Sequence, residues 1–305
     1  MPPSNGERTK GAFAGKAAIV TGGGSGIGAA IARALAARGA TVVIADIDEP
    51  SAKAVAGAIT ADGGQASTAV LDVRDAVAVA DLVSQTTAEH GELDLMFNNA
   101  GIAVGGPAEQ LTLDHWDRVL DVNVRGVVHG VHAAYPVMLR QGHGHIVNTA
   151  SLAGLVPGPG LAPYAAAKHA VVGLSLSLRA EGASRGVKVS AVCPGFVDTP
   201  LLGRVNAGLP QIEMDADAAT LAQRLGKLYR PDALAQDVLR GVERNRALIV
   251  APRSARIAWR TVRYAPGLAM RTAIAWVGRD AEARAAAASV PEQSPAAAGS
   301  ATPRD

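Results

Sequence analysis

The sequence predicts an α/β protein in which helices cover both faces of one parallel sheet of about seven strands. Short apolar runs rich in β-branched residues alternate with longer segments of helical periodicity. The runs are too continuously apolar to face water on one side, so each is expected to be buried on both faces. A glycine-rich turn joins the first run to the first helical segment. Such doubly wound sheets bind ligands beyond the carboxyl ends of their strands.

The first two strands and the helix between them have the clearest patterns. Ala17–Thr21 is a short apolar run, and Ile27–Arg38 repeats apolar residues at helical spacing. Thr41–Asp46 is β-branched and apolar, as expected for the second strand. The other expected strands are 67–71, 93–98, 145–151, 187–193 and 247–250. The other expected helices are near 50–61 and over 75–90, 114–140 and 163–184.

One catalytic domain is expected over residues 15–251. Residues 1–14 are polar and residues 283–305 are rich in Ala, Pro, Ser and Gly, so both are expected to be disordered tails. The 29 basic and 27 acidic side chains nearly cancel, which disfavours a dedicated nucleic-acid binder. The only cysteine, Cys193, excludes an intrachain disulfide and any multi-cysteine metal site. The sequence shows no secretory signal and no apolar run long enough to span a membrane, so a cytoplasmic protein is expected.

Residues 252–282 are expected to form a basic helical extension. Eight arginines and no acid lie between Arg244 and Arg279. Four of them are spaced three, four and three residues apart and therefore share one helix face, Arg253, Arg256, Arg260 and Arg263. Such an amphipathic segment can lie on an anionic membrane surface, through residues 252–279. It can equally pack on its own or a neighbouring subunit with its arginines in water, and both alternatives remain open.

The glycine-rich turn Thr21–Gly28 joins the first expected strand to the first expected helix. Its glycines permit a tight turn and a close approach to a pyrophosphate, which the N–H groups of the helix N-terminus would bind. This context favours a dinucleotide site in a Rossmann-type sheet over an ordinary strand–helix connection. The expected cofactor contacts in the turn are Gly22, Gly24, Ser25, Gly26, Ile27 and Gly28.

Asp46 ends the second expected strand. An acid at this position can bind both hydroxyls of the adenosine ribose and would repel a 2′-phosphate. No basic residue lies in the glycine-rich turn to bind an additional phosphate, so NAD is favoured over NADP. Asp46 or Asp48 can alternatively cap the helix expected near Pro50, and the two roles are compatible.

Three residues are candidates for chemistry at the substrate. Ser151 follows the fifth apolar run, and Tyr164 and Lys168 lie one turn apart on an expected helix. An ammonium beside a tyrosine favours the phenolate, so Lys168 is expected to lower the pKa of Tyr164 and let it exchange a proton with a substrate oxygen. The Ser151 hydroxyl can hold the same oxygen. With a dinucleotide site upstream, these residues predict hydride transfer between a nicotinamide cofactor and an alcohol or carbonyl.

Over roughly residues 14–251 the chain resembles the compact, single-domain branch of the short-chain dehydrogenase/reductase family. The turn has that family's spacing, Gly22-x-x-x-Gly26-x-Gly28, and Tyr164-x-x-x-Lys168 follows Ser151 as in the family. The remaining matching motifs are Asp72-Val73, Asn98-Asn99-Ala100-Gly101, Asn123-Val124 and Pro194-Gly195.

The resemblance implies a role for each catalytic residue. Tyr164 would be the general acid/base, and Lys168 would lower its pKa and bind the nicotinamide ribose. Ser151 would orient the substrate oxygen, and Asn123 would support a water through which protons leave. The resemblance also implies a homodimer or homotetramer.

It likewise implies further contacts to the cofactor. Pro194, Gly195, Val197 and Thr199 would hold the nicotinamide, and the backbone of Val197 would contact its carboxamide. The remaining implied cofactor contacts are Asp72, Val73, Asn99, Ala100 and Gly101. Alternatives exist for two of them, because Asn99 can form a turn and Asp72 can cap the helix that follows.

Two segments are expected to form the substrate pocket. Leu152–Pro163 contains no charge, and Gly195–Ile212 is mostly apolar, with Asp198 and Arg204 as its charges. An apolar alcohol or ketone is therefore favoured, and Arg204 is interpreted as a solvated charge rather than a carboxylate ligand. No metal site is expected, because His143 and His145 have no further ligand nearby. His115, Trp116 and Asp117 form one turn on the substrate side, with no role assigned.

Two other functions are compatible with parts of this pattern. A non-catalytic dinucleotide sensor would share the fold, but it has no need of Tyr164 and the other residues of the chemical site. An epimerase or dehydratase of the family's extended branch would usually carry a different glycine spacing and a separate substrate lobe. An alcohol dehydrogenase or ketone reductase remains the preferred interpretation.

Overall fold

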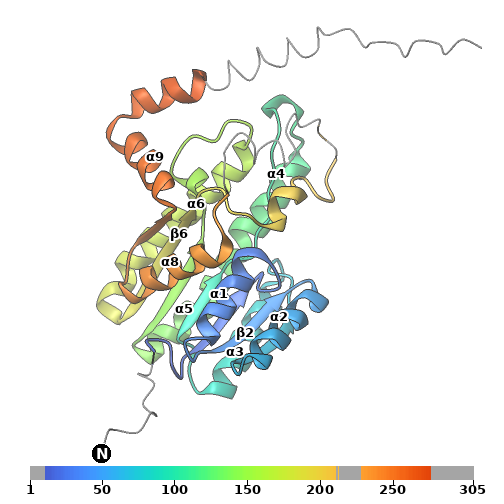
Figure 1. Cartoon of the computed structure of the whole chain (residues 1–305), viewed down its shortest axis with the longest axis vertical. Helices are drawn as coiled ribbons and strands as arrows, with labels where there is room; N and C mark the ends of the chain where they lie inside the picture. The colour runs from blue at the N-terminus through green and yellow to red at the C-terminus, as the bar shows by residue number, and fades with distance from the viewer. Residues whose placement is uncertain (1–10, 211, 213–227, 276–305) are drawn as a thin grey trace, which may run out of the picture.

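The computed structural model describes residues 11–210, 212 and 228–275, and it contains one sheet of 7 parallel strands (Figure 1). The strand order is β3-β2-β1-β4-β5-β6-β7, so the order reverses at β1. The strands are β1 (Ala17–Thr21), β2 (Thr41–Asp46), β3 (Gln65–Val70), β4 (Leu95–Asn98), β5 (Gly144–Thr149), β6 (Val187–Pro194) and β7 (Leu248–Ala251). The predicted doubly wound fold is confirmed, and the reversal places the ligand crevice between the ends of β1 and β4.

Helices connect the strands and cover both faces of the sheet. They are α1 (Gly26–Ala36), α2 (Glu49–Ala61), α3 (Ala76–His90), α4 (Leu113–Leu120), α5 (Gly126–Gln141), α6 (Ala162–Gly182), α8 (Pro231–Glu243) and α9 (Arg253–Tyr264). Among the described helices, none is both long enough and apolar enough to cross a membrane.

Two aspartates set the starts of consecutive helices. The Asp48 carboxylate accepts a hydrogen bond from the backbone N–H of Ser51 at 3.2 Å and so caps α2. Asp75 caps α3 in the same way, by accepting hydrogen bonds from two N–H groups of the first turn. The cap of α2 is therefore Asp48 rather than Asp46, and the cap of α3 is Asp75 rather than Asp72.

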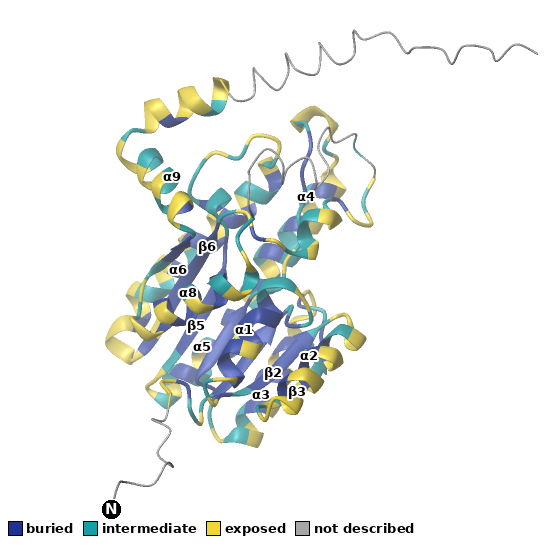
Figure 2. Ribbon diagram, viewed as in Figure 1, coloured by how far each residue is buried: buried dark blue, intermediate teal, exposed yellow. Residues whose placement is uncertain are grey.

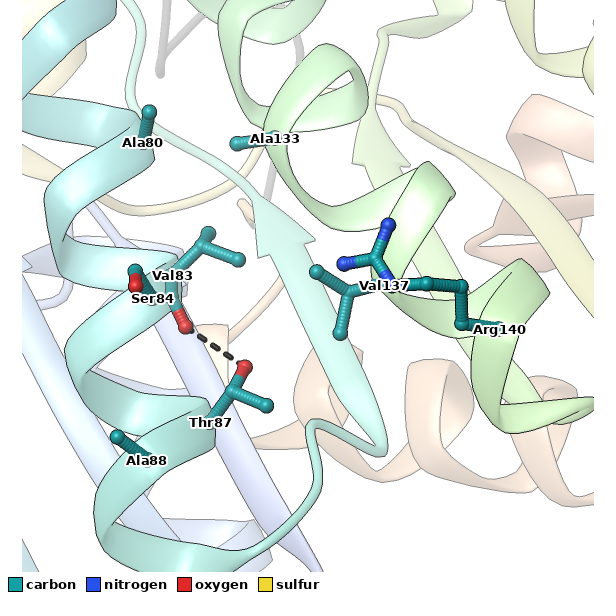
Figure 3. A pocket seen from close by; sticks show the side chains of 8 residues that line it. All are labelled: Ala80, Val83, Ser84, Thr87, Ala88, Ala133, Val137 and Arg140. Atoms are coloured by element: carbon teal, nitrogen blue, oxygen red, sulfur yellow. Dashed lines mark hydrogen bonds between the residues drawn. The ribbon is translucent and has the colours of Figure 1, made fainter.

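One face of the sheet is covered by α3, α5 and α6, whose apolar side chains form one buried cluster with those of the strands. Figure 2 shows β2, β5 and β6 in dark blue, the colour of buried residues. A groove of about 350 Å³ remains on the outer side of this layer, between α3 and α5 (Figure 3). Val83 and Val137 face each other across it, and the Thr87 hydroxyl is turned inward to its own helix, donating to the Val83 carbonyl at 2.7 Å.

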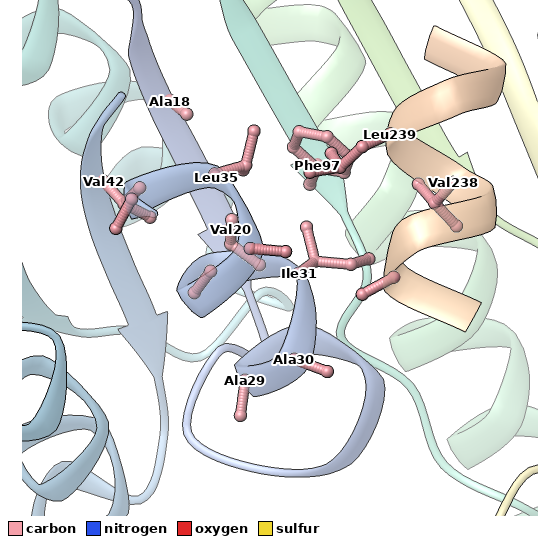
Figure 4. Packing of buried hydrophobic residues seen from close by; sticks show 14 of the residues in the cluster. Ala18, Val20, Ala29, Ala30, Ile31, Leu35, Val42, Phe97, Val238 and Leu239 are labelled. Carbon is pink, nitrogen blue, oxygen red and sulfur yellow. The ribbon is translucent and has the colours of Figure 1, made fainter. Parts of the chain in front are cut away.

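The opposite face is covered by α1, α2 and α8. Ile31 and Leu35 of α1 pack between the sheet, represented by Phe97, and α8, represented by Val238 and Leu239 (Figure 4). All five side chains are fully buried. Burial of large apolar side chains contributes about 1.5–3 kcal/mol each, so this layer fixes α1, and with it the glycine-rich turn, firmly against the sheet.

Three details differ from the sequence-based expectation. Strand β3 begins two residues before the expected 67, because its outward-facing residues are polar and hide its start. The expected helix over 114–140 is three pieces, α4, a π-helix at Asp121–Arg125, and α5. Helix α8 was not expected, although its buried residues recur at helical spacing.

The boundaries of the folded domain also differ. Phe13 is only 3% exposed, and the Arg38 guanidinium lies 5.7 Å from its ring centre, so residues 11–14 belong to the fold and not to a disordered tail. The other residues of both expected tails lie outside the described part of the chain. At the C-terminal end, α9 packs through Ala255 and Trp259, whereas Arg260 is exposed, in agreement with the expected amphipathic pattern.

Candidate active site

The candidate active site lies where the carboxyl ends of β1, β4, β5 and β6 meet. Thr21, the last residue of β1, joins two of these ends through its buried hydroxyl. That oxygen accepts hydrogen bonds from the backbone N–H groups of Asn99 at 2.9 Å and Ala100 at 3.1 Å. The segment after β4 is thereby fixed beside the glycine-rich turn.

Close packing explains the glycines of this turn. A Cβ atom at Gly28 would lie 2.1 Å from the Gly22 carbonyl oxygen, so any larger residue would push α1 away from the turn. Gly22 and Gly26 have φ values of 62° and 51°, a region that glycine adopts without strain. Ser25 precedes α1, and its side chain forms no cap hydrogen bond. The first N–H groups of α1 therefore keep their capacity to bind an anion.

Asp46 lies directly beside this turn. Its carboxylate accepts hydrogen bonds from the backbone N–H groups of Gly24 at 2.9 Å and Asp48 at 3.0 Å. Asp46 is half-buried. The carboxylate is therefore held at the end of β2, next to the N-terminus of α1, where the ribose of a dinucleotide would lie.

The Asp72-Val73 pair is engaged with other parts of the protein. Arg74 donates to both carboxylate oxygens of Asp72, and these hydrogen bonds lower the pKa of the Asp72 carboxyl. The Val73 side chain is buried against Gly126 of α5, and its carbonyl accepts from the His129 ring. The surfaces left for an adenine are consequently the exposed parts of this segment rather than the Val73 side chain.

The side chain of Asn99 connects three strand ends. Its amide nitrogen donates to the carbonyl of Thr21 at 3.1 Å, and its amide oxygen accepts from the Thr149 hydroxyl at 3.2 Å. Thr21 and Thr149 were not among the residues predicted from the sequence. A threonine at a strand end carries no motif by itself, and its role becomes visible only when the strands are paired.

Ser151, Tyr164 and Lys168 are brought together by β5 and α6. The hydroxyl of Ser151 lies close enough to that of the partly buried Tyr164 to lower the pKa of its phenol. The Lys168 ammonium lies 5.6 Å from the centre of the Tyr164 ring. It is buried and donates to the Thr149 carbonyl at 2.9 Å. The three predicted side chains therefore meet at one point.

The pKa values at this point differ from the expectation. Burial raises the pKa of the Tyr164 phenol above its ordinary value, and the hydrogen bond with Ser151 opposes this rise. The expected lowering of the Tyr164 pKa by Lys168 is not found. Burial instead lowers the pKa of Lys168 to about 8. Both groups are thus destabilised in their charged forms, so a negative charge on Tyr164 and a positive charge on Lys168 would stabilise each other.

Asn123 lies within the π-helix, an element that frequently occurs at functional sites. Its side chain is fully buried, accepts from the N–H of Ile102 at 2.9 Å and donates to the Ile102 carbonyl at 3.0 Å. A Cβ atom at Gly101 would lie 3.0 Å from the Asn123 amide oxygen and 3.5 Å from the Lys168 nitrogen. The Asn123 side chain is therefore occupied by the loop after β4, beside Lys168.

The segment after β6 returns to the glycine-rich turn. The N–H of Gly195 donates to the Ala251 carbonyl at 2.8 Å, and Val197 is buried and forms a bridge with Tyr229. Thr199 then packs on Gly26, where an added Cβ would lie 3.1 Å from its methyl group. The expected nicotinamide segment, Pro194 to Thr199, is consequently fixed between β7 and the turn.

Two buried polar residues on the substrate side were not assigned by the sequence. His115 of α4 is within 3.1 Å of the Pro210 carbonyl, and Asn206 hydrogen-bonds the backbone of Gly105. These contacts join residues about one hundred positions apart, so sequence spacing gives no indication of them. Among the described residues, no group of three or more His, Cys, Asp or Glu side chains could hold a metal ion.

Comparison with known proteins identifies the family. A sequence model of the short chain dehydrogenase family matches residues 16–210. Cyclohexanol dehydrogenase of Acinetobacter sp. is 36% identical, with 74% of this chain and 87% of that protein aligned. Cis-4-hydroxycyclohexanecarboxylate dehydrogenase of Sinomonas cyclohexanicum is 42% identical, with 74% of this chain and 89% of that protein aligned.

Solved structures agree with this assignment. A short chain dehydrogenase/reductase of Burkholderia phymatum in complex with NAD superposes with a TM-score of 0.74 and 32% identity, covering 84% of this chain and 95% of that one. Levodione reductase has a TM-score of 0.70 and 31% identity, covering 78% of this chain and 96% of that one. The chain therefore belongs to the short-chain dehydrogenase family and is an oxidoreductase that uses a nicotinamide cofactor to interconvert an alcohol and its ketone.

Proposed function

We propose that the chain oxidises a secondary alcohol on an apolar, six-membered carbocyclic ring, or reduces the corresponding ketone, with NAD as its cofactor. The observation that carries this proposal is the meeting of the Ser151 and Tyr164 hydroxyls beside the buried Lys168 ammonium. A sensor of dinucleotides needs no such proton-transfer group. Two of the relatives are named as dehydrogenases of cyclohexanol and of a hydroxycyclohexane carboxylate, which supports a ring alcohol as substrate.

In this proposal Tyr164 is the general acid/base. Its phenolate oxygen takes the proton of the substrate hydroxyl during oxidation, and its phenol returns a proton during reduction. The Ser151 hydroxyl donates a hydrogen bond to the same substrate oxygen and fixes its position. The Lys168 ammonium stabilises the phenolate and would bind the nicotinamide ribose. A bound nicotinamide would supply the redox chemistry, taking the hydride from the carbon that bears the hydroxyl during oxidation and returning it to the carbonyl carbon during reduction.

The surroundings of Tyr164 favour an apolar substrate. Its ring packs against a cluster in which Val104, Val119 and Ala167 are buried and Leu209 is partly buried. Arg204 is exposed, which supports a solvated role rather than a carboxylate site. An apolar ring would gain about 25 cal/mol per Å² of surface that it buries in such a pocket.

The cofactor proposal rests on Asp46 and the glycine-rich turn. Asp46 is held at the end of β2 by two backbone N–H groups, so its carboxylate occupies a fixed position. A fixed negative charge there accepts hydrogen bonds from ribose hydroxyls and repels a 2′-phosphate, which favours NAD. The uncapped start of α1 and the glycines that tolerate no Cβ form a cradle of the size and charge that a pyrophosphate needs.

The proposal is tested by following the absorbance of NADH. The purified chain is offered NAD with cyclohexanol, a linear secondary alcohol and a sugar alcohol. We expect the highest kcat/KM for cyclohexanol, because the ring fits an apolar site and the sugar alcohol would leave its hydroxyls unpaired. Tight NAD binding with no turnover of any alcohol or ketone would instead support a sensor.

We also propose that the chain assembles into a homodimer or homotetramer. Val128 of α5 and Leu176 of α6 are both exposed large apolar residues on the outer side of the same layer. Covering them in a symmetric interface would remove apolar surface from water. Light scattering should give a multiple of the 30.9 kDa chain mass, and Leu176→Glu should reduce it. A monomeric mass at micromolar concentration would contradict the proposal.

One of the two alternatives for the C-terminal extension is contact with an anionic membrane surface. The C-terminal arm, residues 253–275, contains five arginines and no acid. Tyr264, Leu268, Met270 and Ile274 are exposed apolar residues in its second half. The arm follows β7 directly and therefore leaves the sheet at the end that carries the active site. We propose that this arm binds anionic phospholipid peripherally.

Sedimentation with vesicles tests this contact. We expect binding to phosphatidylcholine vesicles that contain phosphatidylserine, little binding to phosphatidylcholine alone, and release by salt, because screening weakens surface charge attraction. Ile274→Ser and Arg263→Gln should each weaken binding without altering NADH production. If the protein ignores anionic vesicles at low salt, the arm instead packs on protein.

A further inference from the structure

Two asparagine side chains hold the backbone of the loop after β4. Asn123 forms two hydrogen bonds to the backbone of Ile102. Asn206 forms two hydrogen bonds to the backbone of Gly105, three residues further along the same loop. Asn123 lies in the π-helix before α5. Asn206 lies in the substrate segment, the predicted pocket segment Gly195–Ile212 that follows β6. The short loop 101–106 therefore links the two.

Asn206 is built into this position. It is 5% exposed, its amide oxygen accepts from the Gly105 N–H at 3.0 Å, and its amide nitrogen donates to the Gly105 carbonyl at 2.7 Å. Its own N–H donates to the Ala103 carbonyl at 3.1 Å. Its φ of 57° lies in the left-handed region, which costs most residues free energy and which asparagine tolerates better. The Asn206 side chain thus supplies to Gly105 the hydrogen-bond donor and acceptor that another stretch of backbone would otherwise supply.

His115 forms the second attachment of the substrate segment. The ring is fully buried, and its Nδ1 accepts from the backbone N–H of Thr112 at 3.3 Å. The proton of the neutral ring is therefore on Nε2, which lies 3.1 Å from the Pro210 carbonyl oxygen and donates to it. Helix α4 is thereby joined to the substrate segment four residues beyond Asn206.

Leu209 lies between these two attachments. Its N–H donates to the Asn206 carbonyl at 3.1 Å, and its side chain packs on the apolar cluster that also contacts Tyr164. The neighbouring Ile212 side chain packs against Gly106, where an added Cβ would lie 2.9 Å from it. Gly106 in turn donates its N–H to Gly160, in the other predicted pocket segment, at 2.8 Å. The segments that carry Asn206, Ile212 and Gly160 thus all contact the loop 101–106.

We propose that Asn206 and His115 are positioning residues that fix Leu209 as one wall of the substrate pocket and thereby set the ring size that the enzyme accepts. Neither side chain touches the reacting atoms. Both are buried and hold backbone groups, so their effect reaches the substrate through the position of Leu209. This inference rests on the proposed function, because ring size has meaning only if ring alcohols are substrates.

The test compares Asn206→Gly with the wild type. Glycine adopts the left-handed φ without strain, so this variant removes the side-chain hydrogen bonds to Gly105 and keeps the backbone conformation accessible. We expect the ratio of kcat/KM for cyclohexanol over cyclooctanol to fall about tenfold, the factor expected for losing about 1.4 kcal/mol of positioning. The Kd for NAD should stay unchanged, and the Gly105 amide should exchange its hydrogen faster in the variant.

The variants His115→Leu and His115→Gln provide a second, independent test. Leucine keeps an apolar volume but cannot donate to Pro210, so the ring-size ratio should fall as in Asn206→Gly. Glutamine retains a donor and an acceptor and should recover most of the selectivity. The matched control is Asn245→Gly, which also removes an asparagine of positive φ (47°), but one that binds Arg179 far from the substrate side. This variant should change stability without changing the ratio.

The outcomes separate the inference from the function on which it rests. If the wild type oxidises ring alcohols and Asn206→Gly keeps the wild-type ratio while Gly105 exchanges faster, the attachments are merely structural and the inference is wrong. If Asn245→Gly lowers the ratio equally, general loosening explains the effect and the inference is again wrong. If the wild type turns over no ring alcohol, the proposed function fails first and the inference fails with it.

Discussion

Asn123 and Asn206 bind the backbone of the same loop, the first at Ile102 and the second at Gly105, each through one accepted and one donated hydrogen bond. Each pair is worth about 1–3 kcal/mol if a typical net hydrogen bond contributes 0.5–1.5 kcal/mol. The loop is consequently a fixed part between the helix that carries Asn123 and the segment that carries Leu209. Rearranging the substrate wall would require breaking one of these pairs.

The glycine-rich turn should tolerate no side chain at Gly28. Gly28→Ala would place a Cβ 2.1 Å from the Gly22 carbonyl oxygen, and overpacking of this kind costs about 1–3 kcal/mol or more. We expect a lower free energy of unfolding in urea and much weaker NAD binding. The matched control is Gly57→Ala on the exposed side of α2, where nothing lies within 4 Å. That change should stabilise the protein by about 0.5–1 kcal/mol, and equal effects at both positions would contradict this account of the turn.

Cofactor preference should depend on the charge of Asp46. Asp46→Asn keeps one acceptor oxygen for the Gly24 N–H and removes the charge that repels a 2′-phosphate. We expect the ratio of kcat/KM for NADP over NAD to rise at least about tenfold, the factor that corresponds to 1.4 kcal/mol. Asp48→Asn, which alters the neighbouring cap of α2, serves as the control and should leave the ratio unchanged. A wild type that already prefers NADP would refute the assignment.

The buried His145 should make the protein sensitive to acid. Burial lowers the pKa of its ring to about 3, from 6.5 in the unfolded chain. Between these values the unfolded state binds more protons than the folded state, so stability is lost as pH falls from about 6.5 towards 3, at up to about 1.4 kcal/mol per pH unit. His145→Gln can keep a hydrogen bond to Ser190 and should flatten this slope. Parallel stability curves for the two proteins would show that another group dominates.

Alcohol oxidation should accelerate as pH rises. Oxidation needs the Tyr164 phenolate, and burial raises the pKa of this phenol, so the active form increases towards alkaline pH, whereas ketone reduction needs the phenol and should weaken there. The hydrogen bond with Ser151 lowers the pKa of Tyr164. Ser151→Ala should therefore move the midpoint of the kcat/KM profile for oxidation, which reports the free enzyme, to higher pH, besides reducing the maximum. A midpoint that stays in place or moves lower would contradict the assigned hydrogen bond.

Much of the fold could be predicted because its signals are local. Strands such as Thr41–Asp46 are buried on both faces, so their sequence is continuously apolar and their bounds were predicted correctly. Strand β3 was placed late because it lies at the sheet edge and alternates with polar residues. The π-helix around Asn123 was missed because one additional residue in a turn leaves the apolar pattern of a long helix nearly unchanged.

Some residues of the candidate site could likewise be predicted from local sequence signals, and others could not. Tyr164 and Lys168 are one helical turn apart, and the glycines of the turn are adjacent, so spacing alone placed them together. Spacing could not predict the direction of the Tyr164 pKa, because burial by distant segments determines it. His115 and Asn206 escaped assignment for the same reason, since their partners lie 95 and 101 residues away in the sequence.

The most direct test of the account is the turnover of Tyr164→Phe with NAD and cyclohexanol. Phenylalanine keeps the ring that packs on the apolar cluster and removes only the hydroxyl that exchanges the proton. We predict that NADH production falls by at least about a hundredfold, the lower range for loss of general acid–base catalysis, while the Kd for NAD and the melting temperature stay near wild-type values. A variant that folds, binds NAD and oxidises cyclohexanol at the wild-type rate would contradict the central claim that Tyr164 is the acid/base.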